Sequence, residues 1–290
     1  MSRDRLAWQS KLILLLVLPV VGCGIVFETS GWLGTAPSVA CWTLGLGSAL
    51  GVLTLLLRAA TPFAAITGAA IAAQLMYATS VTPFHAWRTY MIPVLAVSLL
   101  AFFVTRVGRS QKEQLGTAEA RHGRSAAQVA ANLGAAALVS TSLFESWAVN
   151  SRWLPHSAMA LLAASLAAMA EAAADTVSSE IGQVLGGRPR MITTWRSVDP
   201  GTDGGITLIG SLAGIAAAAI VAGLGAFAIY GGNLHFLVVS GSGAVFGLFV
   251  DSLLGATLER RGWLNNDAVN FLSTISAAAF TLIAIAIQLR

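Results

Sequence analysis

Five short polar motifs carry most of the residues of this apolar chain that could do chemistry. They are GRSAAQVAAN (123–132), ADTVSSEIG (174–182), GTDGG (201–205), DSLLGA (251–256) and NNDAVN (265–270). A carboxylate placed within hydrocarbon costs about 2.5–3.5 kcal/mol on insertion scales, so an acid retained there is by default a functional-site hypothesis. Because all five motifs fall on one side of the predicted membrane, we interpret them as parts of one site.

The acidic residues of these motifs are the candidate metal ligands. Mg²⁺ takes one or two carboxylates together with substrate phosphate oxygens. Hydroxyls stand between Asp175 and Glu180, and this grouping predicts a magnesium site, with a weaker case for Glu171 one turn earlier. Asp251 interrupts an apolar helix, and Asp267 begins the last one. The alternatives are a solvated helix end for the second motif, an ion pair with an arginine for Asp251 and a helix cap for Asp267.

Two further features predict the binding of phosphate or of another polar ligand. The loop that ends in GTDGG contains three arginines, and the backbone amides of a glycine-rich turn before a helix form an anion site. The loop lacks the pattern of a P-loop, and a plain turn with arginines is its alternative. Arg124, Gln128 and Asn132 are four residues apart and share one helix face. They form either a ladder for a polar ligand or an interhelical hydrogen-bond seam, and the spacing favours neither.

Composition and apolar runs predict the elements that must position these residues. Of the 290 residues, 56% are hydrophobic and 10% are charged, against about 25% charged in a soluble domain. The chain is therefore expected to be an all-α polytopic membrane protein of about nine transmembrane helices, with residues 1–290 in a single domain. The apolar runs lie near 11–27, 38–57, 62–81, 89–105, 128–148, 156–175, 207–230, 235–257 and 268–288.

The charges of the loops predict the orientation. The loops of one side contain 14 of the 17 Lys and Arg residues, and the other side contains Arg88, Arg152 and Arg290. The positive-inside rule then places the N-terminus in the cytoplasm and, with an odd number of spans, the C-terminus outside. The longer cytoplasmic loops are expected at about 106–127, 176–206 and 258–267. The same rule explains the net charge of +4 without a nucleic-acid partner.

The remaining reactive residues form no recognisable site. The four histidines have no ligand spacing, and no Ser/His/Asp or Cys/His arrangement occurs, which argues against zinc and against covalent catalysis. Cys23 and Cys41 fall near the same end of the first two spans. A disulfide between them is one interpretation, and two buried free thiols are the commoner case.

In combination, the motifs resemble the phytyl-phosphate kinase family of plants and cyanobacteria, whose archaeal, bacterial and animal relatives are known as an integral membrane domain of unknown function. The resemblance rests on TRVGRSQKEQLGTAEARHGRSAAQVAAN, ADTVSSEIG, GTDGGITLIGS, DSLLGA and NNDAVNFL, and covers roughly residues 50–290. It implies phosphoryl transfer from a nucleoside triphosphate, CTP by analogy with related prenyl-alcohol kinases, to a membrane prenyl monophosphate of phytyl or geranylgeranyl type. Two departures concern the substrate: alanines precede Asp175 where an asparagine is frequent, and Glu259 replaces a common glutamine.

The resemblance assigns roles to individual residues. Those expected in catalysis are Asp175, Glu180, Asp251, Lys112 and Arg124, and those expected to bind substrate or nucleotide are Gly123, Gln128, Asn132, Gly201, Thr202, Gly204, Gly205, Ser252 and Asn270. The expected ligands of Mg²⁺ are Asp175, Glu180, Asp251 and Asp267. Lys112, Arg124 and the glycine loop would clamp phosphate, while the prenyl tail would lie in a lipid-facing groove. The expected partners are a prenyl-phosphate lipid, a nucleoside triphosphate and the lipids of the cytoplasmic membrane, with the site facing the cytoplasm.

A transporter or flippase for prenyl-phosphate lipids is the alternative function. Alternating access needs polar residues near the midplane that can be reached from both faces. Toward the predicted outside the chain has few beyond Glu28, Glu145 and Arg88. The one-sided polarity therefore favours chemistry on a lipid head group over transport.

Overall fold

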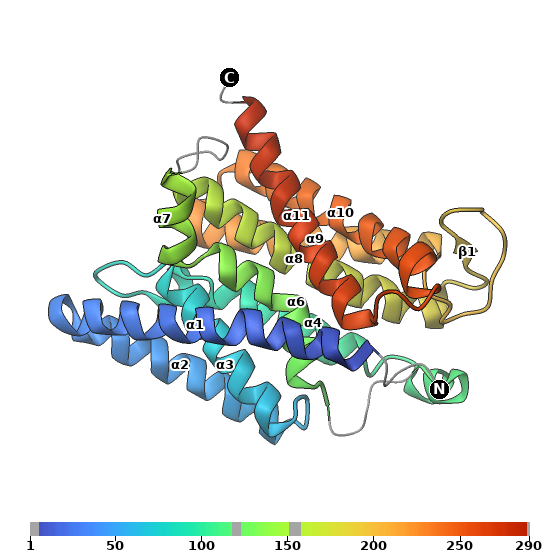
Figure 1. Cartoon of the computed structure of the whole chain (residues 1–290), viewed down its shortest axis with the longest axis horizontal. Helices are drawn as coiled ribbons and strands as arrows, with labels where there is room; N and C mark the ends of the chain where they lie inside the picture. Colours follow the sequence, from blue (N-terminus) through green and yellow to red (C-terminus); the bar gives the residue numbers. More distant parts are fainter. Residues whose placement is uncertain (1–5, 118–122, 151–157, 289–290) are drawn as a thin grey trace.

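The computed structural model describes residues 6–117, 123–150 and 158–288, which form a helical bundle with one small β-ribbon (Figure 1). The helices are α1 (Ala7–Thr35), α2 (Pro37–Leu56), α3 (Pro62–Tyr77), α4 (Met91–Val104), α5 (Arg109–Leu115), α6 (Ala126–Val139), α7 (Ser142–Asn150), α8 (Ala158–Leu185), α9 (Leu208–Tyr230), α10 (Leu234–Leu254) and α11 (Asn266–Gln288). The short elements are the 3-10 turn η2 (Ala86–Arg88), the strands β1 (Arg190–Met191) and β2 (Gly205–Ile206), and the π-helical turn η3 (Gly255–Glu259). The predicted helical architecture is confirmed apart from these two-residue strands.

Most of the helices are long and apolar enough to cross a membrane. Within the described residues six helices meet this condition, namely α1, α2, α8, α9, α11 and α10 with its π-helical turn. The number rises to eight if each of two bent pairs is one span: α4 with α5, bent by 71°, and α6 with α7, bent by 52°. α3 is a shorter apolar helix. Each of the nine predicted runs overlaps one of these helices or pairs. The chain is therefore a multi-pass membrane protein. The number of crossings and the side of the membrane on which each terminus lies stay predictions.

The predicted run 128–148 is a bent pair instead of one straight helix. The hydroxyls of Ser140 and Thr141 donate hydrogen bonds to the carbonyls of Ala137 and Leu138, each over 2.7–2.8 Å. The Thr141 hydroxyl also accepts a hydrogen bond from the backbone N–H of Phe144 at 3.1 Å. Because such hydroxyls compete with the helical backbone bonds, they end α6 and begin α7 at this point.

α8 lies at the centre of the bundle, in contact with α4, α6, α9, α10 and α11. Of its most apolar stretch 78% is buried, against 22% for α1 and 28% for α2. Alanines make up much of α8, and small residues let neighbouring membrane helices approach closely. α1 and α2 instead expose apolar side chains along much of their length. Cys23 and Cys41 are free thiols exposed on these two helices, so the expectation of free thiols is confirmed and that of their burial is wrong.

α8 continues ten residues beyond its predicted end at residue 175 and takes in the whole ADTVSSEIG motif. The helix reaches Leu185 because the sequence contains no proline there and no pair of glycines before Gly186 and Gly187. Gly187 then adopts a left-handed backbone conformation with φ of +68°. The predicted loop at 176–206 is therefore shorter, and its first part is a helical face. α5 likewise lies inside the predicted loop at 106–127.

The polar segments gather at one end of the molecule, which we call the basic end and define as residues 57–61, 106–117, 123–125, 186–207 and 255–265. The β1–β2 loop and the start of α1 lie at this end, and α7 lies at the opposite one (Figure 1). β1 pairs with β2 in antiparallel register, Arg190 opposite Ile206 and Met191 opposite Gly205. The ribbon leads directly into α9, whose N-cap Thr207 accepts a hydrogen bond from the N–H of Gly210 at 3.0 Å.

Candidate functional site

A polar cavity of about 290 Å³ opens at the basic end between α6, α8, α10, α11 and the loop that precedes α9. All five polar motifs contribute to its wall. Twelve of the 15 predicted site residues line it, and they are Arg124, Gln128, Asn132, Asp175, Glu180, Gly201, Thr202, Gly204, Gly205, Asp251, Ser252 and Asn270. Lys112, Gly123 and Asp267 do not line it. The fold therefore brings together residues that lie up to 153 positions apart, from Thr117 to Asn270.

The carboxyls of Asp175 on α8 and Asp251 on α10 both line this cavity and interact electrostatically with each other. The Oδ2 atom of Asp251 is buried and has no hydrogen-bond partner among the described residues. Two carboxylates that interact repel each other, and a bound cation relieves this repulsion. A pair of carboxylates with an unpartnered oxygen fits Mg²⁺, which takes one or two carboxylates and fills its other positions with water and phosphate oxygens.

The structure does not bring the four predicted metal ligands together. Among the described residues, no three His, Cys, Asp or Glu side chains converge as a metal-binding group. Glu171, the weaker candidate one turn before Asp175, is almost fully buried, and its Oε1 atom has no hydrogen-bond partner among the described residues. Glu180 and Asp267 are engaged in other contacts, described next. The pair of Asp175 and Asp251 remains as the candidate metal site.

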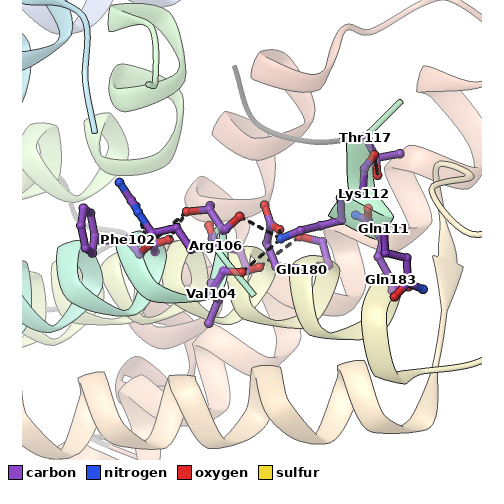
Figure 2. A network of polar contacts seen from close by, with 12 residues as sticks. Phe102, Val104, Arg106, Gln111, Lys112, Thr117, Glu180 and Gln183 are labelled. Atoms are coloured by element: carbon purple, nitrogen blue, oxygen red, sulfur yellow. Dashed lines mark hydrogen bonds and ion pairs between the residues drawn. The ribbon is translucent and has the colours of Figure 1, made fainter. Parts of the chain in front are cut away.

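Lys112 and Glu180 form a buried ion pair that fastens α5 to α8 (Figure 2). The ammonium of Lys112 also donates hydrogen bonds to the carbonyls of Val104 at 3.2 Å and Thr105 at 3.0 Å. An ammonium has three protons, and these three acceptors occupy them. In this structure Lys112 closes the C-terminal end of α4 and holds Glu180 at the edge of the cavity, and its role as a phosphate clamp stays a prediction.

Asp267 connects α11 to α1 and lies outside the cavity. Its carboxylate accepts a hydrogen bond from the Ser10 hydroxyl at 2.6 Å. The neighbouring Asn265 caps α11 through the N–H of Ala268 at 2.9 Å and donates to the carbonyl of Leu6 at 3.0 Å. This part of NNDAVN has the structural role of a helix cap and an interhelical tie, and the assignment of Asp267 as a metal ligand stays a prediction.

The ladder formed by the first motif is divided between a site residue and structural contacts. Gln128 forms a capping box with Ser125: its side-chain oxygen accepts from the Ser125 N–H at 2.7 Å, and its own N–H donates to the Ser125 hydroxyl at 3.2 Å. Asn132 accepts a hydrogen bond from Asn270 across helices at 3.5 Å. Arg124 reaches across to α8, where it donates to the hydroxyl of Thr176 at 3.3 Å. Arg124 is thus the ladder residue that brings charge to the cavity.

Gly123 positions Arg124 and does not face the polar cavity. Its φ of +82° lies in the left-handed region, and a Cβ at this position would lie 2.3 Å from the carbonyl carbon of Ala59. The close approach lets the N–H of Arg124 donate to the Ala59 carbonyl, while the N–H of Thr61 donates to the Arg124 carbonyl, both at 3.0 Å. Gly123 therefore has a role in backbone packing and lines a neighbouring cavity, and its predicted role in substrate binding stays a prediction.

The GTDGG loop docks against the end of α10 by a similar close approach. Gly204 has a φ of +75°, and a Cβ there would lie 2.4 Å from the Cβ of Ala256. A Cβ at Gly255 would in turn lie 2.9 Å from the backbone nitrogen of Gly204. The Thr202 hydroxyl donates to the Asp199 carbonyl at 2.7 Å, which folds the loop into a turn. The loop is therefore a fixed wall of the cavity.

The charges of the cavity wall are mainly negative. The wall contains the carboxyls of Asp175, Glu180, Asp251 and two residues that the sequence interpretation did not assign, Asp203 and Glu259. Among the described residues that line it, Arg124 is the one basic residue. Asp203 lies inside the GTDGG motif, and Glu259 lies eight residues after Asp251 in the sequence. Their positions in or near the polar motifs could have identified both as candidate site residues. A phosphate that binds here requires additional positive charge.

Comparison with known proteins identifies the family. The model of the integral membrane protein family DUF92 matches residues 49–278. An uncharacterized membrane protein of Synechocystis is 32% identical over 203 residues, which cover 68% of this chain and 73% of that protein. An uncharacterized membrane protein of Methanocaldococcus jannaschii is 39% identical over 110 residues, 38% of this chain and 45% of that protein.

A plant protein is also similar to the chain. The chloroplastic protein VTE6 of Arabidopsis thaliana is 28% identical over 209 residues, 70% of this chain and 60% of that protein. The chain thus spans less than two thirds of the archaeal and plant relatives. No solved structure matches it. Relatives from a plant chloroplast, a cyanobacterium and an archaeon agree with the resemblance drawn from the motifs, and the chain belongs to the DUF92 family of integral membrane proteins.

Proposed function

We propose that this chain is a membrane prenyl-phosphate kinase. It transfers the terminal phosphoryl group of a nucleoside triphosphate, preferably CTP, to a prenyl monophosphate of phytyl or geranylgeranyl type and forms the diphosphate. The observation that carries the proposal is the convergence of all five motifs on one polar cavity, whose wall contains Asp175, Asp251 and Arg124. The similarity to VTE6 and the resemblance to the phytyl-phosphate kinase family support it.

The acid-rich wall suits phosphoryl transfer that depends on a divalent cation. Asp175 and Asp251 would hold Mg²⁺, which would supply positive charge to neutralise the phosphate oxygens. Arg124 would hold one phosphate, and the backbone amides of the GTDGG loop would hold a second one. Phosphoryl transfer requires mainly positioning and the stabilisation of charge, which these groups can supply without a protein nucleophile.

The bond changes need no general base. An oxygen of the prenyl phosphate forms a bond to the terminal phosphorus of the nucleotide, and the bond from that phosphorus to the β–γ bridging oxygen breaks. The nucleoside diphosphate leaves with the electron pair of the broken bond. The attacking oxygen is already anionic at neutral pH, because the second pKa of a phosphate monoester is about 6. The protein therefore has to bring two anions together, and cations rather than a base limit the reaction.

The test is a transfer assay with purified protein in lipid nanodiscs. Geranylgeranyl or phytyl monophosphate is incubated with Mg²⁺ and each of the four nucleoside triphosphates labelled at the terminal phosphate. We expect labelled prenyl diphosphate, with CTP the best donor, and its loss on chelation of Mg²⁺. The absence of diphosphate with every donor and every chain length would contradict the kinase proposal. Movement of a labelled prenyl phosphate between leaflets without any transfer would favour the flippase alternative.

A further inference from the structure

A second cavity of about 330 Å³ lies beside the polar one and has a different chemical character. It is enclosed by α2, α3, α4 and α6, and reaches Ala172 on α8. Its inner wall is apolar and includes Leu50, Val94, Val97 and Leu133. On α4 the lining extends from Val94 to Thr105, about 16 Å along the helix at 1.5 Å per residue. We call it the apolar cavity.

The two cavities are adjacent, since Arg124 and Asn132 line both of them. The rim of the apolar cavity at the basic end carries Arg58, Arg106 and Arg109 in addition to Arg124. None of the described residues that line it is acidic, whereas five acids line the polar cavity. An apolar interior with a cationic rim complements a molecule that has a hydrocarbon tail and an anionic head.

We propose that the apolar cavity binds the hydrocarbon tail of the lipid monophosphate and places its phosphate at Arg124, on the boundary between the two cavities. The nucleotide then occupies the polar cavity, and the two substrates approach the boundary from opposite sides. This inference rests on the proposed function and adds to it the location of the lipid and the residues that select its tail.

The helices around the apolar cavity also provide a route for a lipid. α2 packs on α3, and α4 packs on α8 and α9, while α2 and α4 share no extensive contact among the described residues. At the basic end, the Arg106 guanidinium lies 3.4 Å from the centroid of the Phe102 ring and donates to the Leu57 carbonyl at 3.4 Å. This contact connects the ends of α4 and α2 and leaves a cation at the level of the lipid head group. The tail reaches its cavity between these two helices.

Gly68 on α3 determines the free volume of the apolar cavity. A Cβ at this position would meet only a methyl group of Val129, at an ordinary contact distance of 3.8 Å. Gly51, which also lines the cavity, is different, because a Cβ there would lie 3.0 Å from the carbonyl oxygen of Ala65. A larger side chain at Gly68 therefore fills the space of the tail, whereas one at Gly51 would separate α2 from α3.

The experiment fills the cavity and measures which tails the enzyme accepts. Gly68→Leu is compared with wild type in the transfer assay, using geranyl, farnesyl and geranylgeranyl monophosphates. We expect kcat/KM for the geranylgeranyl substrate to fall by about tenfold or more, since pocket volume discriminates on this scale, while the geranyl substrate reacts as in wild type. Val97→Phe, on α4, should likewise lower kcat/KM for the geranylgeranyl substrate more than for the geranyl substrate. We call this dependence of kcat/KM on tail length the profile. An equal loss for all three tails, or an unchanged profile in both variants, would overturn the proposal.

A control variant separates the cavity from general effects on the fold. Gly45→Leu puts the same leucine on α2 at an exposed position, where no atom lies within 4 Å of the added Cβ and which does not line the cavity. It should behave as wild type. A shifted profile in Gly45→Leu would show that the tail binds elsewhere.

A binding measurement separates this inference from the kinase proposal. A prenyl monophosphate with a diazirine on its tail is photolysed with the nanodisc-embedded protein in the absence of nucleotide, and the labelled peptides are mapped. We expect labels on α3 and α4 that decrease in Gly68→Leu. Labelling there without any diphosphate product would contradict the kinase function and leave the lipid site intact. Diphosphate product with labels on other helices would contradict the lipid site alone.

Discussion

The two cavities of this protein share Arg124 and Asn132 but are built in opposite ways. The polar cavity is formed by helix ends and a loop, and it contains acids, amides and glycines in short motifs. The interior of the apolar cavity is formed by the middle parts of helices and contains mainly alanine, valine, leucine and glycine, while its arginines lie at the rim. A polar ligand needs specific groups at fixed positions, whereas a hydrocarbon tail needs volume. A polar site can therefore be recognised in a sequence, whereas an apolar cavity cannot.

Of the variants that distinguish the two cavities, Asp251→Asn is expected to have the largest effect on phosphoryl transfer. The amide keeps the shape of the side chain but removes half of the carboxyl pair that would hold the cation, so transfer should fall by about a thousandfold. Photolabelling of the apolar cavity by the lipid should not change. Glu28→Gln, which also replaces a carboxyl by its amide but lies on α1 outside both cavities, is the control and should be fully active. An active Asp251→Asn enzyme would show that the polar cavity is not the site of transfer.

The next effect concerns the ion pair between Lys112 and Glu180, which fastens α5 to α8. α5 carries Arg109 at the rim of the apolar cavity, and α8 forms part of the wall of the polar cavity. Lys112→Met leaves Glu180 without its buried partner and should lower the free energy of unfolding by about 3 kcal/mol. The double variant Lys112→Met, Glu180→Gln should recover part of this loss. Unfolding of the membrane-embedded protein in a denaturing detergent titration measures both. Equal stability of the single and double variants would contradict a coupled pair.

Arg124 tests the boundary itself. Arg124→Ala should lower kcat/KM by about a hundredfold and weaken the apparent affinity for the prenyl phosphate more than that for the nucleotide. Arg124→Lys keeps the charge without the two-pronged geometry of a guanidinium and should recover only part of the activity. Initial rates with each substrate varied in turn give the two KM values. A change confined to the KM of the nucleotide would place Arg124 in the polar cavity alone.

The smallest effect is expected from the docking of the GTDGG loop. Gly204→Ala combines a positive φ, which costs about 1–2 kcal/mol for other residues, with the close contact to Ala256. Gly187→Ala has the same kind of φ, +68°, but no atom within 4 Å, so it isolates the conformational part. The Tm of Gly204→Ala should be lower than that of Gly187→Ala, and only Gly204→Ala should raise the KM of the nucleotide. Identical behaviour of the two would mean that the loop does not need its contact with α10.

The parts of the polar site that were predictable from the sequence are those that a membrane helix can hardly contain by accident. Asp175 and Asp251 were recognisable because carboxyls are rare in apolar helices, and the glycines of GTDGG because they cluster before one. Their mutual contact depends on the packing of α8 against α10, which no local pattern specifies. Lys112 and Asp267 were assigned to the site because partners distant in the sequence, Glu180 and Ser10, could not be foreseen.

The helices were predictable and their ends were not. Apolar runs indicate where the chain can cross a membrane, and each run overlaps a helix or bent pair. They do not indicate where a helix continues beyond its apolar run, so the extension of α8 to Leu185 was missed. The apolar cavity left no signal, because Gly68 has the same appearance in the sequence as Gly47, whose Cβ would press on the carbonyl oxygen of Ala69 at 3.0 Å.

The central position of α8 has a consequence for how the protein is made. α8 is the least hydropathic of the six long helices and the one most enclosed by protein, and it carries Glu171 and Asp175. During synthesis it leaves the ribosome before α9, α10 and α11, the helices that later shield these acids from lipid. Carboxyls in contact with lipid oppose insertion, so we expect α8 to enter the bilayer fully only when α10 is available to pack against it. A chain truncated before Leu234 should therefore be retained by quality control, and the site exists only once biosynthesis of the whole bundle is complete.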